Sequence, residues 1–220
     1  MIDHNKTEAV LIRIARLISA FFSPYYIAFV AFLILFLFSY LRIMPLQYKL
    51  IVLGVVYAFT ILIPHLTIYI FRKVNGYTRD DMAQRRQRYV PLFLYLISYI
   101  FCLVIMRRLN IPWYMKGIIL TALLMMVICL VFNLQWRISE HMAGAGATIG
   151  GLVAFSMLFG YNPVWWLCAL IMVTGIVGSA RIVLGHHSLG EVLVGFAVGL
   201  TCSFMVLHPF YNDLLRFLLF

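Results

Sequence analysis

Long runs of apolar residues, separated by short polar connections, fill almost the whole chain. A helix needs about twenty mostly apolar residues to cross the hydrocarbon core of a bilayer. Seven stretches come close to that length, near residues 19–41, 49–71, 91–107, 115–134, 141–160, 163–180 and 189–207. The pattern predicts an all-α polytopic membrane helix bundle with six to seven transmembrane helices. Because these stretches account for most of the chain, we expect residues 1–220 to form a single integral-membrane domain.

The segment 1–18 has a different pattern. Apolar residues between Val10 and Ile18 recur at helical spacing, and Arg13 and Arg16 lie on the opposite face. Such a segment is typical of an amphipathic helix that lies at the membrane interface. Charged residues interrupt it and no small-residue cleavage site follows, so we expect it to be retained rather than removed as a signal peptide.

The composition agrees with a membrane protein and limits how the charge is interpreted. Of the 220 residues, 65% are hydrophobic and 11% are charged, and the mean hydropathy is +1.01, which excludes an ordinary soluble domain. The net charge of +10 comes from basic residues in the short connections and at the ends of the apolar runs. We expect these residues to be topology signals and anion ligands, and we expect no nucleic-acid partner. The four cysteines lie inside apolar runs without a CxxC pair, so they indicate neither a metal site nor a redox compartment.

Pro64 and His65 interrupt the second apolar run. Pro64 removes a backbone donor and is expected to kink the helix. The favoured interpretation of His65 is structural, with the imidazole bonded to a freed carbonyl or to a neighbouring helix. A role toward substrate is the alternative.

A polar cluster between the last two apolar runs carries the strongest chemical signal. It holds a fixed cation, Arg181, an imidazole, His187, and a carboxylate, Glu191, and such groups are costly near a bilayer unless they are paired or functional. His187 and Glu191 are four residues apart, so on a helix that begins near His187 the carboxylate could hold the imidazole. An arginine that binds an anion, a histidine that attacks it and a carboxylate that fixes the tautomer are the groups needed for phosphoryl transfer through a histidine nucleophile. A structural alternative exists, because Ser188 and Glu191 also match a helix capping box.

Two other polar segments could bind an anion. Ser139 is a natural N-cap for the fifth apolar run, with His141 in the first turn, and the amides of a helix start point toward any anion placed there. The connection 72–90 carries the densest basic cluster, which can be a positive-inside signal or a phosphate clamp. Counting the crossings places both segments and residues 179–191 on the same membrane face, so we expect them to converge on one site.

The same segments resemble the motifs of the type 2 phosphatidic acid phosphatase superfamily of integral-membrane lipid phosphatases. The third motif of that family is Ser-Arg, five residues, His, three residues, Asp. Ala180-Arg181, His187 and Glu191 match its spacing, with Ala for Ser and Glu for Asp. The second motif, Pro-Ser-Gly-His, is similar to Ile138-Ser139-Glu140-His141.

The first motif, Lys, six residues, Arg-Pro, has a looser counterpart. Arg85 and Arg88, which precede Pro91, resemble a variant with spread arginines and are the favoured match. The motif-bearing core then spans about residues 72–195, and the resemblance implies the helical bundle fold of that superfamily.

The resemblance implies a metal-independent phosphatase without a cofactor. His187 would attack phosphorus and form a phosphohistidine, Glu191 would orient His187, and His141 would protonate the leaving group and then activate water. The phosphate oxygens would be held by four residues: Arg181, Ser139, Arg85 and Arg88. The substrate would be a lipid phosphate or diphosphate that reaches the site laterally from the membrane lipids. The implied location is the bacterial inner (plasma) membrane, as a multi-pass protein.

Three alternatives and one question stay open at this point. The first alternative is a metal site built from Glu140, His141, His186, His187 and Glu191, which has suitable ligand types but no HExxH-like spacing. The second is a non-enzymatic lipid-binding or transport protein, and the third is a lipid phosphotransferase of the same fold. The question is sidedness: the face of the site carries eleven of the 17 Lys and Arg residues, but only eight against six once Arg85, Arg88 and Arg181 are set aside as ligands.

Overall fold

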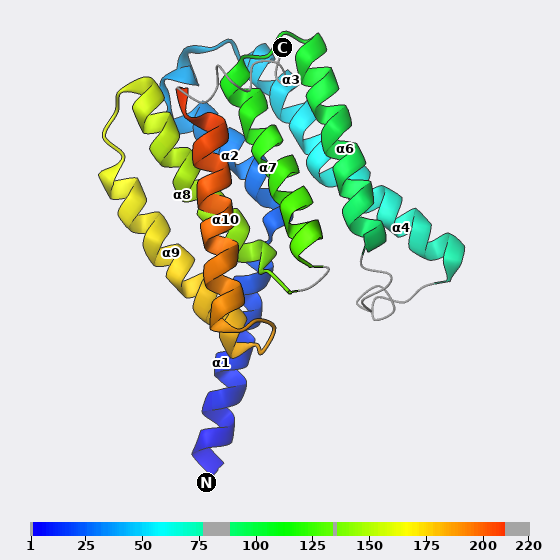
Figure 1. Cartoon of the computed structure of the whole chain (residues 1–220), viewed down its shortest axis with the longest axis vertical. Coiled ribbons are helices and arrows are strands. Elements are labelled where there is room, and N and C mark those ends of the chain that lie inside the picture. Colours follow the sequence, from blue (N-terminus) through cyan, green and yellow to red (C-terminus); the bar gives the residue numbers. More distant parts are fainter. Residues whose placement is uncertain (1, 77–88, 134–135, 210–220) are drawn as a thin grey trace. The chain divides into compact units, whose positions relative to one another are not determined.

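The computed structural model describes residues 2–76, 89–133 and 136–209 (Figure 1). Every regular element in these ranges is a helix, so the predicted all-α architecture is confirmed. The helices are α1 (Ile2–Phe21), α2 (Pro24–Phe38), η1 (Tyr40–Ile43), α3 (Leu46–Tyr57), η2 (Ala58–Leu62), α4 (Ile63–Asn75), α6 (Tyr89–Arg108), α7 (Trp113–Phe132), α8 (Glu140–Phe159), α9 (Val164–Val183) and α10 (Leu189–Leu207).

The helices have the length and apolarity of a multi-pass membrane protein. Within the described ranges, six are long and apolar enough to cross a bilayer, and α3 to α4 count as one continuous helix over Leu46–Asn75. A seventh span results if α1 and α2 are taken together as one broken span. The predicted number of six to seven spans is therefore confirmed.

The first predicted span, residues 19–41, is wrong as a single helix. Helix α1 continues through Phe21 and α2 begins at Pro24, so the break falls inside the predicted run. Pro24 has no N–H and disfavours helical backbone at the residue before it, an effect that an average of hydropathy does not register. Helix α2 alone has 15 residues, fewer than the roughly twenty that a span needs.

Helix α1 is also more than an interfacial segment. It extends three residues beyond the predicted end at 18, and its last turns pack against α9. Ala15 and Ser19 are buried there. Ile18 and Phe22 contact a core cluster made of Met142, Val177 and Val192.

The described chain forms two compact groups of helices. One group contains α1, α8, α9 and α10, and the other contains α3, α4, α6 and most of α2 and α7.

In the second group η2 is a π-helical turn just before Pro64. Nδ1 of His65 lies 2.8 Å from the carbonyl oxygen of Ile61 and 3.3 Å from the hydroxyl of Tyr95. The predicted bond of the His65 imidazole to a backbone carbonyl is confirmed.

In the first group, α8 and α10 run in the same direction with their backbones in close contact. A Cβ at Gly146 or Gly150 would overlap the backbone of α10, and a Cβ at Gly199 would overlap the carbonyl oxygen of Ala143. Small residues at a membrane helix interface permit such an approach. The starts of α8 and α10 therefore lie side by side, at the end of the group where α9 also finishes (Figure 1).

We expect Gly199→Ala to destabilise the protein by about 1–3 kcal/mol, because the added methyl group must push the two backbones apart. Gly175→Ala in α9 is the matched control, since a Cβ there would meet nothing within 4 Å and alanine is the better helix former. Unfolding in detergent by a denaturing surfactant measures both. Equal stability of the two variants would contradict the close α8–α10 contact.

Candidate functional site

The start of α10 is a capping box. Ser188 is the N-cap, and its Oγ accepts the N–H of Glu191 at 3.4 Å. In return the N–H of Ser188 donates to Oε2 of Glu191 at 3.1 Å. The helix therefore begins at Leu189, two residues after His187, and the predicted capping box is confirmed.

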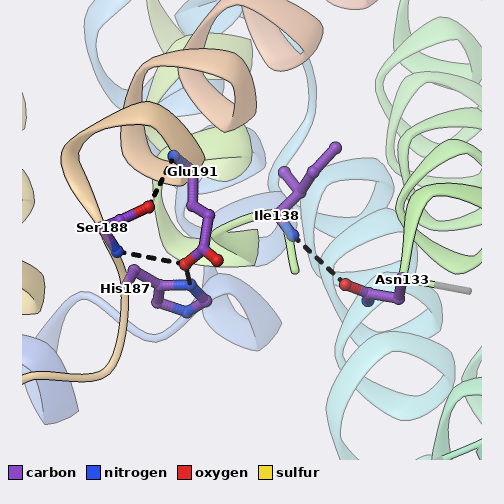
Figure 2. Close-up of polar contacts among 5 residues, drawn as sticks. All are labelled: Asn133, Ile138, His187, Ser188 and Glu191. Atoms are coloured by element: carbon purple, nitrogen blue, oxygen red, sulfur yellow. Dashed lines mark hydrogen bonds and ion pairs between the residues drawn. The ribbon is translucent and has the colours of Figure 1, made fainter. Parts of the chain in front are cut away.

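The same carboxylate oxygen binds His187. Oε2 of Glu191 lies 3.1 Å from Nδ1 of His187. Figure 2 draws this contact as a dashed line. A carboxylate accepts and does not donate, so Nδ1 carries the proton and Nε2 of the neutral ring keeps its lone pair. The predicted contact between His187 and Glu191 is confirmed. It coexists with the capping box that was its structural alternative, because one oxygen accepts both N–H groups.

The surroundings of His187 favour a neutral imidazole. Burial has the largest effect and lowers the pKa of His187, and the positive charges of Arg181 and His186 lower it further. The hydrogen bond and the charge of Glu191 raise the pKa, but the net result is below the ordinary value of 6.5. The neighbouring His186 is largely exposed. Partial loss of solvent has the largest effect on its pKa and lowers it, and the charges of Arg181 and Arg16 lower it further. His187 is therefore neutral near pH 7, and the lone pair of its ring lies on Nε2.

Two hydrogen bonds hold the start of α8. The N–H of Ile138 donates to Oδ1 of Asn133, the residue after α7, at 3.2 Å (Figure 2). The N–H of Ser139 donates to the backbone carbonyl of Glu191 in α10 at 3.3 Å. Gly195 gives the room for this contact, because a Cβ there would lie 2.6 Å from the carbonyl oxygen of Ser139. Two segments that are more than forty residues apart in the sequence therefore meet at Ser139 and Glu191.

The hydroxyl of Ser139 is buried and makes no hydrogen bond within the described ranges. Ser139 is the N-cap residue of α8, as expected, and its carbonyl accepts the N–H of Ala143 at 2.9 Å, but its side chain makes no capping bond. The side chain is 0% exposed, and Oγ has no hydrogen-bond partner among the described residues. An unpaired buried hydroxyl costs roughly 1–3 kcal/mol. The site therefore contains a buried polar group that the described part of the chain does not satisfy.

Arg181 and His141 meet at Ser19 of α1. Nη1 of Arg181 donates to Oγ of Ser19 at 2.7 Å, and Nε2 of His141 lies 3.2 Å from the backbone carbonyl oxygen of Ser19. Because a carbonyl only accepts, Nε2 of His141 carries the proton and Nδ1 is the nitrogen left for other chemistry. Nε of Arg181 is buried and has no partner in the part of the chain that the structure describes.

The group α1, α8, α9 and α10 thus brings together most of the predicted site. The charges of His141, Arg181 and His187 are close enough to interact, and Glu140 also acts electrostatically on Arg181. Arg85 and Arg88 lie outside the described residues, so their predicted role stays a prediction.

Sequence reasoning missed the contribution of α1. Arg16 and Ser19 are three residues apart and share a helix face, but nothing in the sequence indicates that this face meets α9. Only the packing of the helices shows it. Helix α1 therefore supplies a charge near His186, from Arg16 in the predicted interfacial segment, and a direct partner for two site residues, from Ser19 at the start of the first predicted span.

The metal alternative does not fit the geometry. Across the described ranges, no three His, Cys, Asp or Glu side chains are placed to hold a metal ion, and this includes the five residues proposed for that site. Glu191 instead uses one oxygen to bind His187 and the backbone of Ser188.

The two serines at helix starts provide a paired test. Ser188→Ala should lower the free energy of unfolding by about 1 kcal/mol, because it removes a capping bond that the structure contains. Ser139→Ala should leave it unchanged or raise it, because the hydroxyl makes no hydrogen bond to any residue that the structure describes. Surfactant unfolding of the two variants measures the difference. A larger loss for Ser139→Ala would mean that its hydroxyl is a structural cap.

Comparisons of the chain with known proteins give no family assignment. No protein-family model, no curated protein and no solved structure matches it significantly. Its function must therefore be inferred from the chemistry of the site.

Proposed function

We propose that the protein is a membrane lipid phosphatase that hydrolyses a lipid phosphate or diphosphate monoester through a phosphohistidine at His187. The observation that carries the proposal is the hydrogen bond between Nδ1 of His187 and Glu191, which leaves Nε2 as a free nucleophile. The motif resemblance to type 2 phosphatidic acid phosphatases supports the same reaction class. The proposed location is the bacterial inner (plasma) membrane, where the substrate would enter laterally from the lipid.

The phosphate would be bound by buried donors that the described helices leave without a partner. Nε of Arg181 and Oγ of Ser139 are buried without a partner among the described residues, and both can donate to phosphate oxygens. A bound phosphate would satisfy both buried groups through charge-assisted hydrogen bonds. Arg85 and Arg88 remain further candidate ligands from the sequence.

In the first proposed step, Nε2 of His187 attacks phosphorus and the bond from phosphorus to the leaving oxygen breaks. The imidazole becomes cationic as the new N–P bond forms. Glu191 would stabilise this charge through the Nδ1–H that it already accepts. The low pKa of His187 keeps the lone pair available before the attack.

His141 would move the protons. When protonated on both nitrogens it would give the Nδ1 proton to the leaving alkoxide or phosphate. It would then accept a proton at Nδ1 from the water that attacks the phosphohistidine, which releases inorganic phosphate and restores both histidines. The bond from Nε2 of His141 to the carbonyl of Ser19 supports this assignment, since it leaves Nδ1 as the exchanging nitrogen.

Two departures from the family motifs have local explanations. Ile138 stands where the second motif has proline, and its N–H donates to Asn133, which a proline could not do. Glu191 stands where the third motif has aspartate. Its longer side chain reaches both His187 and the N–H of Ser188, so the substitution keeps the histidine partner and adds a cap.

The roles of the histidines are tested by alanine variants assayed in saturating chelator. His187→Ala should abolish turnover, because the atom that bonds to phosphorus is gone. His141→Ala should slow an alkyl phosphate by roughly 10²–10⁴-fold and a diphosphate or aryl phosphate by less, because a better leaving group needs less protonation. His186→Ala is the matched control and should retain most activity, since His186 is exposed beside the site.

Steady-state turnover of purified protein against phosphatidate, phosphatidylglycerophosphate, isoprenyl diphosphate and lipid A phosphates is the measurement. Near-normal turnover in His187→Ala would refute the nucleophile assignment. Headgroup binding without turnover in the wild type would favour the lipid-binding alternative, and phosphate transfer to an acceptor other than water would favour the transferase.

The pH profile gives an independent test of the His187–Glu191 pair. For the wild type, kcat/KM should fall as the pH drops below the usual histidine range, because His187 then takes up a proton at Nε2. Glu191 raises the pKa of His187, so Glu191→Gln should move this acid limb to lower pH and also lower kcat. Glu8→Gln, at an exposed glutamate of α1, is the control and should leave the profile unchanged. A shift of the acid limb to higher pH in Glu191→Gln would contradict the pair.

A further inference from the structure

Ser19 of α1 touches two residues of the site with two different groups. Its hydroxyl accepts a hydrogen bond from Nη1 of Arg181 at 2.7 Å, and its backbone carbonyl accepts one from Nε2 of His141 at 3.2 Å. The residue is 8% exposed, so water does not compete strongly for either bond. We infer that Ser19 is a positioning residue that sets the guanidinium of Arg181 and the tautomer of His141. The catalytic meaning of this inference rests on the proposed function.

The end of α1 makes the carbonyl of Ser19 available. The last four carbonyls of a helix have no partner within it, and Ser19 lies in the last four residues of α1. Helix α1 stops there because Pro24 has no N–H and disfavours helical backbone at Ser23. If the helix continued, the N–H of Ser23 would occupy the carbonyl that now binds His141. Because the helix breaks at Ser23-Pro24, the carbonyl of Ser19 is available to accept the hydrogen bond from His141.

The hydroxyl of Ser19 positions the guanidinium of Arg181. It holds one terminal nitrogen of Arg181, and Nε of the same guanidinium is buried without a partner among the described residues. A guanidinium is planar, so fixing one nitrogen restricts the directions of the others. The bond from Arg181 to Ser19 therefore fixes the directions in which the remaining N–H groups of Arg181 can donate to an anion. The two functions of Ser19 are chemically separate and can be removed one at a time.

The first arm of the test measures anion binding. Ser19→Ala should weaken the binding of inorganic phosphate roughly 10- to 100-fold, because a hydrogen bond to a charged group is lost. With a lipid phosphate as substrate, the loss should appear mainly in KM. Ser19→Thr keeps the hydroxyl and should restore most of the affinity. Thr201→Ala is the control, since its hydroxyl donates to carbonyls of its own helix, at 2.7 and 3.2 Å.

The second arm measures the tautomer of His141 directly, by nitrogen NMR of histidine-labelled protein in detergent. The His141 signals are assigned by their loss in His141→Asn. In the wild type and in Ser19→Ala the single proton of the neutral ring should be on Nε2, because the carbonyl is present in both. Pro24→Ala should let α1 continue and shift a population to the Nδ1 proton, and it should lower kcat for an alkyl phosphate more than it raises KM. Pro163→Ala, at the N-cap of α9, is the control for loss of a proline.

The outcomes separate this inference from the proposed function. If no lipid phosphate is hydrolysed, the proposed function fails, and the tautomer measurement still decides the role of Ser19. If turnover is present but Ser19→Ala binds phosphate like the wild type, the role of the hydroxyl is refuted and the phosphatase assignment stands. A neutral wild-type His141 with its proton on Nδ1, or a tautomer unchanged in Pro24→Ala, would overturn the role of the carbonyl.

Discussion

The close backbone contact between α8 and α10 is the constraint on which the site depends. Glycines on both helices allow the two backbones to touch, and Gly195 lets the N–H of Ser139 reach the carbonyl of Glu191. In a membrane, helix association depends on such packing, because lipid supplies no hydrophobic force between helices. The contact therefore places the buried hydroxyl of Ser139 beside the helix start that carries the His187 pair.

The polar groups of the site fall into two classes. Some are satisfied within the fold: Glu191 accepts two N–H groups, and Ser19 accepts from Arg181 and His141. Others remain without a partner among the described residues, namely Oγ of Ser139 and Nε of Arg181. Unpaired buried donors are costly, and their presence beside a free histidine nitrogen is the physical basis for proposing a phosphate ligand. The satisfied groups orient the site: Glu191 holds the imidazole of His187, and Ser19 holds Arg181 and His141.

Much of the structure could be predicted from local sequence pattern. The last predicted span coincides with α10, and the spacing of His187 and Glu191 was sufficient to predict their contact, because both features depend on residues close in the chain. The break before Pro24 was missed because a hydropathy average ignores a single missing N–H. Ser19 was missed because its partners are more than one hundred residues away and are set by the packing of α1 on α9.

The central claim is that phosphate is transferred to Nε2 of His187, and trapping that intermediate tests it most directly. Purified protein would be mixed with a radiolabelled lipid phosphate or diphosphate, quenched in alkali within milliseconds and digested for peptide mapping. We predict an acid-labile, alkali-stable label on the peptide that contains His187, present in His186→Ala and absent in His187→Ala. Label on a serine or a carboxylate, or turnover with label on a histidine other than His187, would contradict the account.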